Sequence, residues 1–514
     1  MKAATTKVAE SDGFRAAREQ GETMERYLES AESMGGTHAE VETYIEREGR
    51  EYERRLYQAH LRLRAAQEQA VAVRGADGVW RHYHRASWRA LMTIFGAVEV
   101  PRLAYQAPAV IGLHPMDASL NLPSELYSHG VRRRVAEETA KSSFDETVEH
   151  LGKTTSAPVQ KRQVEQLAAR AAQDFEAFYA TRAVAVEDTR DLLVLTFDGK
   201  GIAMRHDDLR ASTKKAAEKT PHRLATRIKK GEKRNRKRMT EVAAVYTIAP
   251  YPRTVADVLH DLRPVRDASA TRPRPVNKRV WASVEREMRD VIRAAFDEAL
   301  RRDPGRRRHW VVLLDGNKDQ LAVVKKVARA TNVKVTIVLD VIHVLEYLWK
   351  AAYCFFADGT KEAEAWVQQR LMWLLQGRSA GMLAANMRRN AVARGLGDAE
   401  RAPVDDCADY LVKYRRLLHY DHALAAGLPI ATGVIEGACR YLVKDRMDRT
   451  GARWSLRGAE AVLRLRSLRA SHDFDAYWEF HLDREHARNH RGHYAGGRVP
   501  APIPPAKPRL RRVK

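Results

Sequence analysis

Four short segments rich in apolar residues constrain the fold of this chain most strongly. Residues 192–197 (LLVLTF), 310–314 (WVVLL) and 335–339 (VTIVL) are continuous or nearly continuous apolar runs, and residues 241–249 (EVAAVYTIA) have a similar character. Runs of this length are typical of strands buried on both faces of a sheet. Segments with helical periodicity separate them, including residues 277–302, for which we expect one amphipathic helix. The alternation predicts an α/β fold with a mostly parallel sheet.

The region before the first apolar run has a different pattern. Residues 38–72 are rich in Glu, Arg, Ala and Leu, and they predict a long helix or a pair of helices. Residues 84–105 mix aromatic and β-branched residues around FGAV, and they predict a β-hairpin. Residues 124–181 predict helices with a break near 152–158, an arrangement that suits a helix-turn-helix DNA reader. Two packed helices without a role in DNA binding are the alternative.

These patterns divide the chain into seven segments. Residues from 342 to about 426 have only helical periodicity. The end of the chain is rich in Pro, Gly and Arg, and we expect it to be disordered. The predicted segments are a helical N-terminal region (1–75), a β-hairpin segment (76–115), a helical, helix-turn-helix-like region (116–185), the first part of an α/β core with a basic insertion at 205–240 (186–350), a helical insertion (351–426), the completion of the core (427–475) and a basic tail (476–514).

The charge balance indicates a polyanionic partner. The chain has 90 Lys and Arg against 66 Asp and Glu, a net charge of +24, which favours binding to DNA or RNA. Residues 205–238 hold fourteen Lys or Arg and four acidic residues. Such a segment neutralises phosphates, although a solvated loop is the alternative. Because there is no run of about 18 apolar residues and no signal peptide, we expect a cytoplasmic, nucleoid-associated protein that contacts no membrane.

Acidic residues follow three of the apolar runs. Asp198, Asp315 and Asp340 come at the ends of these runs, and Glu436 lies in a later helical segment, TGVIEGACRYLVKDRM. Functional residues of open α/β sheets gather at the carboxyl ends of strands, and magnesium prefers carboxylate oxygens while it keeps several waters. Turn chemistry explains a single Asp-Gly pair. Several carboxylates in a basic chain instead indicate a metal site, where two ions would support phosphodiester chemistry.

Residues near Glu436 fit the same interpretation. Thr432 is a candidate N-cap for the helix that carries Glu436. Arg440 and Lys444 follow at intervals of four residues, so in an α-helix they share the face of Glu436 and could meet a phosphate. An ordinary surface ion pair is the alternative.

Several motifs in a fixed order resemble the DDE-type transposases of bacterial insertion sequences, most closely the ISKra group, which look related to Mutator-like transposases. The motifs are TFDGKGIAMR, GEKRNRKRM, LLDGN, VLDVIHVLEYLW and TGVIEGACRYLVKDRMDRTGARW, within a resemblance that extends from about Arg89 to Tyr477. It implies an RNase H-like catalytic core with an all-helical insertion before the Glu-bearing helix. By position it also implies that Asp198, Asp315 and Glu436 form the catalytic and metal-binding triad, with two Mg²⁺ or Mn²⁺ ions as cofactors.

The resemblance implies a different role for Asp340. In Mutator-like relatives a Cys or Asp followed by xxH lies just after this strand, and Asp340 with His343 matches that pattern. The pair is then an accessory one that positions DNA or supports the insertion, with a structural or capping role for His343 as the alternative. Trp454 is a candidate for stacking on a base, and packing in the core is its alternative. No cysteine pair precedes residues 113–123, so we expect no zinc knuckle.

The family resemblance implies a DNA transposase that cleaves phosphodiester bonds at the ends of its element by metal-dependent hydrolysis and joins the 3′-OH ends to target DNA. Double-stranded DNA is the expected partner, and paired ends imply a homodimer or larger homo-oligomer. The alternatives are an RNase H-like nuclease or resolvase without strand transfer and a catalytically inactive DNA-binding regulator derived from a transposase. The candidate DNA-contacting residues are Lys161, Arg162, Lys229, Lys230, Lys233, Arg234, Arg236, Lys237, Arg238, Arg440, Lys444 and Trp454.

Overall fold

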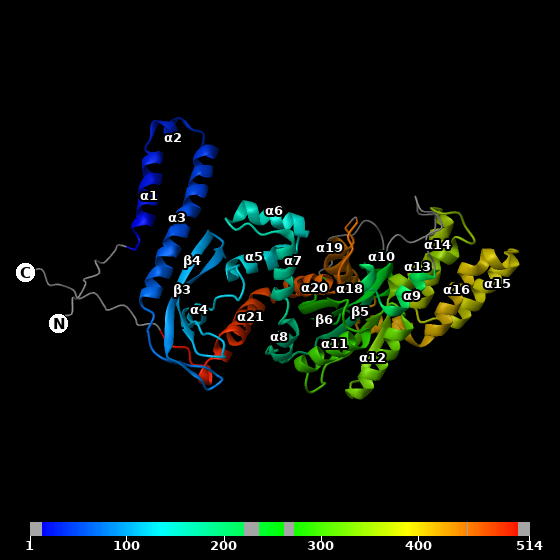
Figure 1. Cartoon of the computed structure of the whole chain (residues 1–514). Coiled ribbons are helices and arrows are strands. Elements are labelled where there is room, and N and C mark those ends of the chain that lie inside the picture. The colour runs from blue at the N-terminus through cyan, green and yellow to red at the C-terminus, as the bar shows by residue number, and fades with distance from the viewer. Residues whose placement is uncertain (1–12, 220–235, 262–271, 450, 502–514) are drawn as a thin grey trace, which may run out of the picture. The chain divides into compact units, whose positions relative to one another are not determined.

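The computed structural model describes residues 13–219, 236–261, 272–449 and 451–501. The chain divides into two compact units (Figure 1). Unit 1 combines Met1–Ala180 with Phe474–Lys514, and unit 2 comprises Thr181–Asp473. Unit 1 is therefore built from both ends of the sequence, and unit 2 is a continuous stretch of chain between them.

Unit 1 begins with helices. The helix α3 (His38–Ala66) confirms the prediction of a long helix that starts at residue 38. A capping box fixes this start, because the Thr37 hydroxyl accepts a hydrogen bond from the Glu40 backbone N–H and the Glu40 carboxylate accepts one from the Thr37 N–H. Two helices precede it, α1 (Arg15–Leu28) and α2 (Ala31–Gly35).

The predicted hairpin is present as the strands β3 (Tyr83–Thr93) and β4 (Gly96–Gln106). The two strands pair antiparallel along their whole length and leave a turn of two residues between them. One face of the hairpin packs on α3, where Leu61 joins Leu91 and Val98 in a buried cluster. A separate two-stranded sheet is formed by β1 (Val73–Arg74) and β2 (Trp80–Arg81).

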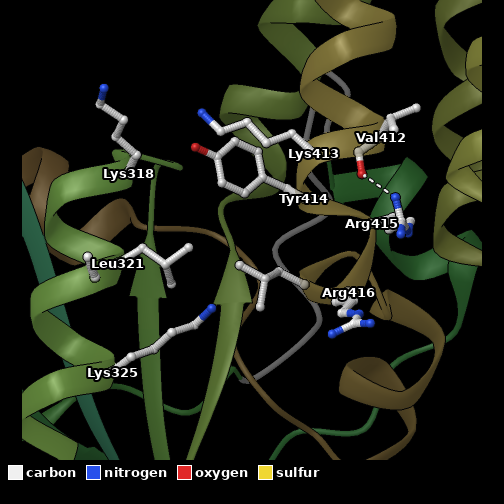
Figure 2. Close-up of a pocket in the computed structure, with 10 residues that line it drawn as sticks. Lys318, Leu321, Lys325, Val412, Lys413, Tyr414, Arg415 and Arg416 are labelled. Atoms are coloured by element: carbon white, nitrogen blue, oxygen red, sulfur yellow. Dashed lines mark hydrogen bonds between the residues drawn. The ribbon is translucent and has the colours of Figure 1, made fainter.

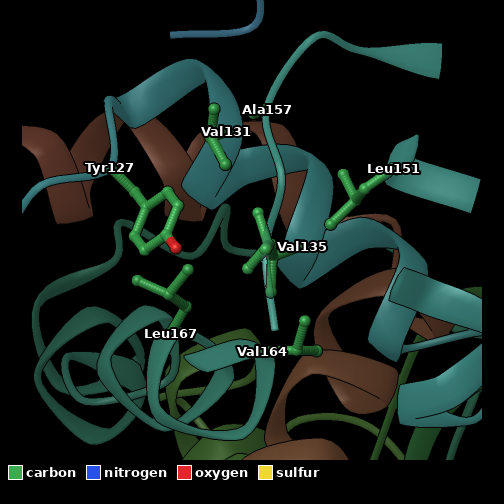
Figure 3. Close-up of a cluster of buried hydrophobic side chains, with 8 residues drawn as sticks. Tyr127, Val131, Val135, Leu151, Ala157, Val164 and Leu167 are labelled. Atoms are coloured by element: carbon green, nitrogen blue, oxygen red, sulfur yellow. The ribbon is translucent and has the colours of Figure 1, made fainter. Parts of the chain in front are cut away.

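A second core of unit 1 forms between three helices, α5 (His129–Thr139), α6 (Phe144–Thr154) and α7 (Lys161–Ala171). Figure 3 shows its apolar side chains, among which Val131, Val135 and Leu151 are fully buried. The predicted break near residues 152–158 is confirmed by the gap between α6 and α7. Two shorter helices complete this part of the chain, α4 (Pro115–Ser119) and α8 (Phe175–Thr181).

The expectation of a disordered tail is wrong for residues 476–489. These residues belong to the helix α21 (Phe474–Asn489), which is part of unit 1. Its buried Glu485 accepts a hydrogen bond from Arg132 of α5 at 2.7 Å, and its buried His481 bonds to Asp174 at 2.7 Å. Composition is misleading here because the Gly and Pro residues that suggested disorder come after α21. The residues that hold α21 in place, Arg132 and Asp174, lie more than 300 residues earlier in the sequence. Residues 502–514 lie outside the described residues.

Unit 2 contains a five-stranded sheet in the order β7-β6-β5-β8-β9. β5 pairs with β8, and β8 with β9, in parallel, whereas β6 pairs antiparallel with both β5 and β7. The sheet is therefore mixed: β6 alone runs against the other four strands, so the prediction of a mostly parallel sheet holds for the strand directions, although two of the four pairings are antiparallel. The strands are β5 (Leu192–Ala203), β6 (Lys237–Ile248), β7 (Val276–Ser283), β8 (Trp310–Leu314) and β9 (Val335–Leu339).

The strand β7 is the element that the sequence pattern misses. We expect a single helix over residues 277–302, but this segment divides into β7 and the helix α11 (Met288–Arg302). Val280 and Trp281 of β7 are buried, and the Val280 N–H and carbonyl bond to the Ser471 hydroxyl on the side away from β6. These contacts come from segments distant in sequence, so local periodicity does not encode them.

Helices cover the sheet and continue into the region predicted to be helical. The helix α11 contacts β5 and β6, and α20 (Leu456–Ala470) contacts β7. No helix in the described ranges is both long enough and apolar enough to span a membrane. The predicted helical region contains α13 (Val341–Ala352), α14 (Lys361–Leu375), α15 (Ala380–Ala393), α16 (Asp398–Tyr414) and α17 (Tyr420–Ala425). The remaining helices of unit 2 are α9 (Ala211–Glu218), α10 (Val255–Asp261), α12 (Lys318–Ala330), α18 (Gly433–Ala438) and α19 (Asp445–Met447).

Replacing Leu151 by Ala tests the core between α5, α6 and α7. Leu151 has no exposed surface, so we expect Leu151→Ala to lower the free energy of unfolding of unit 1 by about 2–5 kcal/mol, through lost burial and the cavity left behind. Leu126→Ala is the control, because Leu126 is 41% exposed and should cost no more than about 1 kcal/mol. Urea unfolding followed by circular dichroism measures both, and equal losses would contradict this core.

Candidate active site

The register of the sheet brings Asp198, Asp315 and Asp340 to neighbouring positions. Asp198 and Asp315 each lie two residues beyond the last parallel residue pair of β5 and β8. Asp315 and Asp340 each lie one residue beyond the last pair of β8 and β9. Because neighbouring strands are about 4.8 Å apart, three aspartates from three adjacent strands lie at one end of the parallel half of the sheet.

Asp198 does not end its strand, and that prediction is wrong. The strand β5 continues to Ala203 because its other edge pairs with β6 beyond the point where its pairing with β8 stops. The half-buried Asp198 accepts a hydrogen bond at Oδ2 from the Cys439 thiol, with 3.1 Å between sulfur and oxygen. Lys200 is exposed two residues further along the same face of β5. One oxygen of the carboxylate is therefore fixed, and a cation lies on the same face.

Asp315 begins a tight loop between β8 and α12. Its Oδ1 accepts a hydrogen bond from the Asn317 N–H at 2.8 Å, which is the turn chemistry expected of an Asp-Gly pair. Gly316 has a φ of +95°, and a Cβ there would lie 2.9 Å from the Tyr410 hydroxyl, so this position requires glycine. The hydroxyls of Tyr410 and Tyr414 on α16 donate to the carbonyls of Asp315, at 2.9 Å, and of Gly316. The helical region therefore holds the Asp315 loop in place.

Asp340 is fully buried and bonds to the chain around it. Its Oδ1 accepts a hydrogen bond from the Ile342 N–H at 2.9 Å and caps α13, and its Oδ2 accepts one from the Thr432 hydroxyl. Thr432 is not the side-chain N-cap that we expected for α18, because its hydroxyl is engaged by Asp340. Asp340 therefore connects the start of the helical region to the segment that leads into Glu436.

Glu436 lies on the short helix α18, close to two of the aspartates. Partial burial and the negative charges of Asp340 and Asp198 raise the pKa of the Glu436 carboxyl, while His343 lowers it. Mutual effects of this kind require charged groups that are near one another. His343 is half-exposed on α13, and its Nδ1 lies 3.4 Å from Glu346 Oε2. The structure thus brings Glu436 and His343 to the region of Asp198 and Asp340.

The helix type changes directly after α18. Residues Cys439–Lys444 form a π-helix, a rare segment that is frequent at functional sites. Its hydrogen bonds span five residues rather than four, so the α-helical spacing behind the prediction that Arg440 and Lys444 share the face of Glu436 does not apply unchanged. Both side chains are nevertheless exposed, and Arg440 Nε lies 3.8 Å from Asp445 Oδ1.

The three predicted metal ligands are not a close group of ligand atoms in the structure. Among the described residues, two groups have three ligand atoms within 4.8 Å of one another, namely His419 with Asp421 and His422, and Asp174 with His481 and Glu485. Asp198, Asp315 and Glu436 are not such a group. Among these residues, Asp198 contributes to the raised pKa of Glu436 through its negative charge.

Sequence reasoning missed three residues near these carboxylates. Cys439 lies three residues after Glu436, and this helical spacing is a signal that could have indicated proximity. Lys200 could have been found from the alternation of side chains after Asp198. Glu241 has no local signal, because its place follows from the pairing of Gly199 with Glu241 across β5 and β6.

Glu241 is a buried carboxyl on the opposite face of the sheet from Asp198. It pairs with Gly199, the next residue of β5, and successive residues of a strand point to opposite faces. Its Oε1 accepts a hydrogen bond from Gln320 Nε2 of α12 at 2.8 Å. Burial raises the pKa of Glu241 to about 8, opposed by the Gln320 hydrogen bond and assisted by the charges of Asp198 and Asp315. A neutral carboxyl therefore lies behind the site at neutral pH.

The predicted DNA-contacting residues are placed unevenly by the structure. Lys161 and Arg162 are exposed at the start of α7, where Lys161 pairs with Asp145 at 2.6 Å. Arg236 is half-buried just before β6, and the exposed Lys237 lies 3.3 Å from Asp448. The residues that lie outside the described ranges are Lys229, Lys230, Lys233 and Arg234.

Two of the predicted contacts have structural roles. Arg238 is half-buried and donates to the Val284 carbonyl at 2.8 Å. Trp454 is 6% exposed, and its Nε1 donates to the Met447 carbonyl at 3.1 Å. Packing in the core, which was the alternative for Trp454, replaces the prediction that its ring stacks on a base.

No protein-family model matches the chain, and a search of curated proteins finds no match either.

Substituting Glu241 by Gln gives a pH-dependent test of the buried carboxyl. The pKa rises from 4.5 to about 8 on folding, so the stability from this group is present below about pH 4.5 and is lost as the pH rises through about 8. Gln keeps an oxygen acceptor for Gln320 and does not titrate. Between about pH 5 and about pH 9 we expect the free energy of unfolding of Glu241→Gln to rise relative to wild type by more than about 1.4 kcal/mol, the equivalent of one pKa unit.

Urea unfolding in the presence of EDTA measures this difference. Glu218→Gln is the control, since Glu218 is exposed and its substitution should give no such pH dependence. A Glu241→Gln variant that keeps the same offset from wild type at both pH values would contradict a neutral carboxyl at this position.

Proposed function

We propose that this chain is a DNA transposase of the DDE type with an RNase H-like core in unit 2. The observation that supports the proposal most is the placement of Asp198, Asp315 and Glu436, because two adjacent strands and one later helix direct carboxylates to one region. The order of elements also supports it. The helices α13 to α17 follow β9, and α18 with Glu436 follows them, as the family resemblance implies.

In this proposal, Asp198, Asp315 and Glu436 would hold two Mg²⁺ or Mn²⁺ ions. Such ions, when bound, activate the attacking oxygen and stabilise the leaving oxygen of a phosphodiester. The chain supplies the arrangement of the ligands. The Cys439 thiol orients one oxygen of Asp198, and the hydroxyl of Tyr410 restrains the Asp315 loop. Neighbours that restrict the ligand-bearing side chains in this way improve the precision of a site.

Asp340 has a positioning role in this scheme. Its carboxylate accepts the Thr432 hydroxyl, and the next residue, Val341, donates its N–H to the Ile430 carbonyl at 2.9 Å. Both contacts hold the segment that precedes α18, so they set where Glu436 lies relative to the strand ends. Asp340 is fully buried and both of its oxygens are already engaged, by the Ile342 N–H and the Thr432 hydroxyl, which fits a structural task rather than a metal ligand.

DNA binding in this scheme uses cations in both units. Lys200 on the face of Asp198, and Arg440 and Lys444 after Glu436, are exposed and would contact phosphates near the scissile bond. In unit 1, α6 and α7 would act as a helix-turn-helix-like reader with Lys161 and Arg162 at the start of its second helix. Joining two element ends would require at least a homodimer on the bacterial nucleoid.

Replacing Asp198 by Asn and Glu436 by Gln tests the proposed triad. Each change keeps the side-chain shape but removes a charged oxygen ligand, so we expect the cleavage of duplex DNA in Mg²⁺ to fall to background. DNA affinity in EDTA should stay within about twofold of wild type, since one charge in many is altered. The matched control is Asp319→Asn, which makes the same change at an exposed carboxylate of α12 and should leave cleavage intact.

The assay uses labelled duplexes that carry the DNA flanking the reading frame, with a plasmid as target. Joined products support a transposase, whereas cleavage without joining supports an RNase H-like nuclease or resolvase. A wild-type chain that binds DNA but never cuts it would favour the catalytically inactive regulator. Full cleavage by either triad variant would overturn the assignment of these carboxylates.

A further inference from the structure

A groove beside the Asp315 loop is lined by Lys and Arg side chains and by no acidic residue. It lies between α12 and the segment that runs from the end of α16 into the short 3-10 helix Arg415–Leu417, and its volume is about 570 Å³. Figure 2 shows side chains of α12 on one side and side chains of residues 412–416 on the other. We call it the α12–α16 groove. Five cations line it and no acidic residue does, namely Lys318, Lys325, Lys413, Arg415 and Arg416.

These cations are exposed and available to a ligand. All five residues are exposed, and within the described part of the chain no carboxylate forms an ion pair with any of them. Arg415 bonds to the Val412 carbonyl at 3.4 Å, and the Lys413 ammonium lies 4.8 Å from the centre of the Tyr414 ring. Two arginines of the helical region provide a contrast, since Arg388 pairs with Asp405 at 2.9 Å and Arg401 with Asp398 at 3.0 Å. Several positive charges that line one groove without acidic partners produce a positive potential, which attracts an anion.

The spacing of the cations matches a polymer of phosphates better than one small anion. Lys318 and Lys325 lie on one stripe of α12, seven residues apart, which is about 10.5 Å along a helix axis. One strand of a DNA duplex rises about 3.4 Å along the duplex axis per phosphate, so a stripe parallel to that axis spans about three phosphates. The cations are flexible, exposed side chains around partly apolar walls that include Leu321 and Leu417. Such groups suit contact with a phosphate backbone, which does not require a closed cage of donors.

The groove is physically attached to the candidate site. Lys318 follows Asp315 by three residues and begins α12. On the other wall, Tyr414 donates to the Gly316 carbonyl, and Tyr410 of the same helix donates to the Asp315 carbonyl at 2.9 Å. A strand that lies in the groove is therefore held next to Asp315 through a short, hydrogen-bonded connection.

We infer that the α12–α16 groove binds the phosphate backbone of the DNA strand that flanks the scissile phosphodiester. This inference rests on the proposed function for the identity of the reaction, and it adds a binding surface in unit 2 separate from the basic segment 205–238 and from the helices of unit 1. The groove reads no base sequence, because its lining offers charge to phosphates rather than an element shaped for a base edge. It fixes where along the strand the cut falls.

A triple variant tests the groove by the salt dependence of DNA binding. Lys325→Ala, Lys413→Ala and Arg416→Ala together remove three cations, while Lys326→Ala, Lys361→Ala and Arg389→Ala remove the same charges from exposed positions outside the lining. The full-length chain is titrated into a fluorescent duplex in EDTA over a series of KCl concentrations. In the groove variant, the slope of log affinity against log salt should shrink by about one for each cation removed.

The control triple should change the slope by less than half as much, with thermal unfolding unchanged in both variants. A groove variant that keeps the wild-type slope would overturn the inference. The inference would also be overturned if the groove variant lost its binding of pyrophosphate but kept the wild-type slope of log DNA affinity against log salt. That result would identify a site for a small anion.

Cleavage in Mg²⁺ is measured separately, so the two proposals fail in different ways. If the wild-type chain cuts DNA and the groove variant binds and cuts it equally well, the groove inference falls and the proposed function stands. If the groove variant loses its DNA affinity but the wild-type chain never cuts, the groove is a DNA-binding surface and the proposed function falls.

Discussion

Strand β5 is hydrogen-bonded along both edges, and the arrangement of the candidate site depends on this pairing. Its parallel edge with β8 sets Asp198 level with Asp315, whereas its antiparallel edge with β6 places Glu241 beside Gly199, on the opposite face. Residues 192–197 are buried, so both faces must be covered by helices. Because a parallel neighbour requires a crossover, α11 lies between β7 and β8 in sequence. The pairing of this one strand therefore determines the positions of both Asp198 and Glu241.

The carboxylates of the site bond to neutral donors, and this distinguishes them from structural acids in the same unit. Asp198 accepts the Cys439 thiol, and Asp315 accepts the Asn317 N–H. Glu298 provides the contrast: although burial raises its pKa, Arg279 and Arg302 lower it to about 2. Guanidinium partners satisfy the charge of Glu298 within the protein. A thiol or backbone N–H donor orients a carboxylate but leaves its negative charge for an external cation.

Much of this arrangement follows from local sequence pattern. The apolar runs identify β5, β8 and β9 because strands buried on both faces need apolar residues at every position, and the aspartates are recognisable because they adjoin these runs. The features that could not be predicted depend on distant partners. The strand β7 is positioned by its pairing with β6 and by hydrogen bonds to Ser471. The Thr432 hydroxyl bonds to Asp340 instead of capping α18, and α21 is held by Arg132. The π-helix after Glu436 likewise has no period in the sequence that marks it.

The construction of unit 1 from both chain ends has a consequence for biosynthesis. Helix α5 carries a buried Arg132 that pairs with Glu125 at 3.2 Å and with Glu485 of α21 at 2.7 Å, so the second of these carboxylates is made 353 residues after the guanidinium. At about 5–20 residues per second, the ribosome needs on the order of 15–60 s to make residues 181–473. All strands of the five-stranded sheet emerge within that interval, which lets unit 2 fold first. Until α21 is made, the N-terminal helices lack the contacts that α21 supplies, among them the ion pair of Arg132 with Glu485.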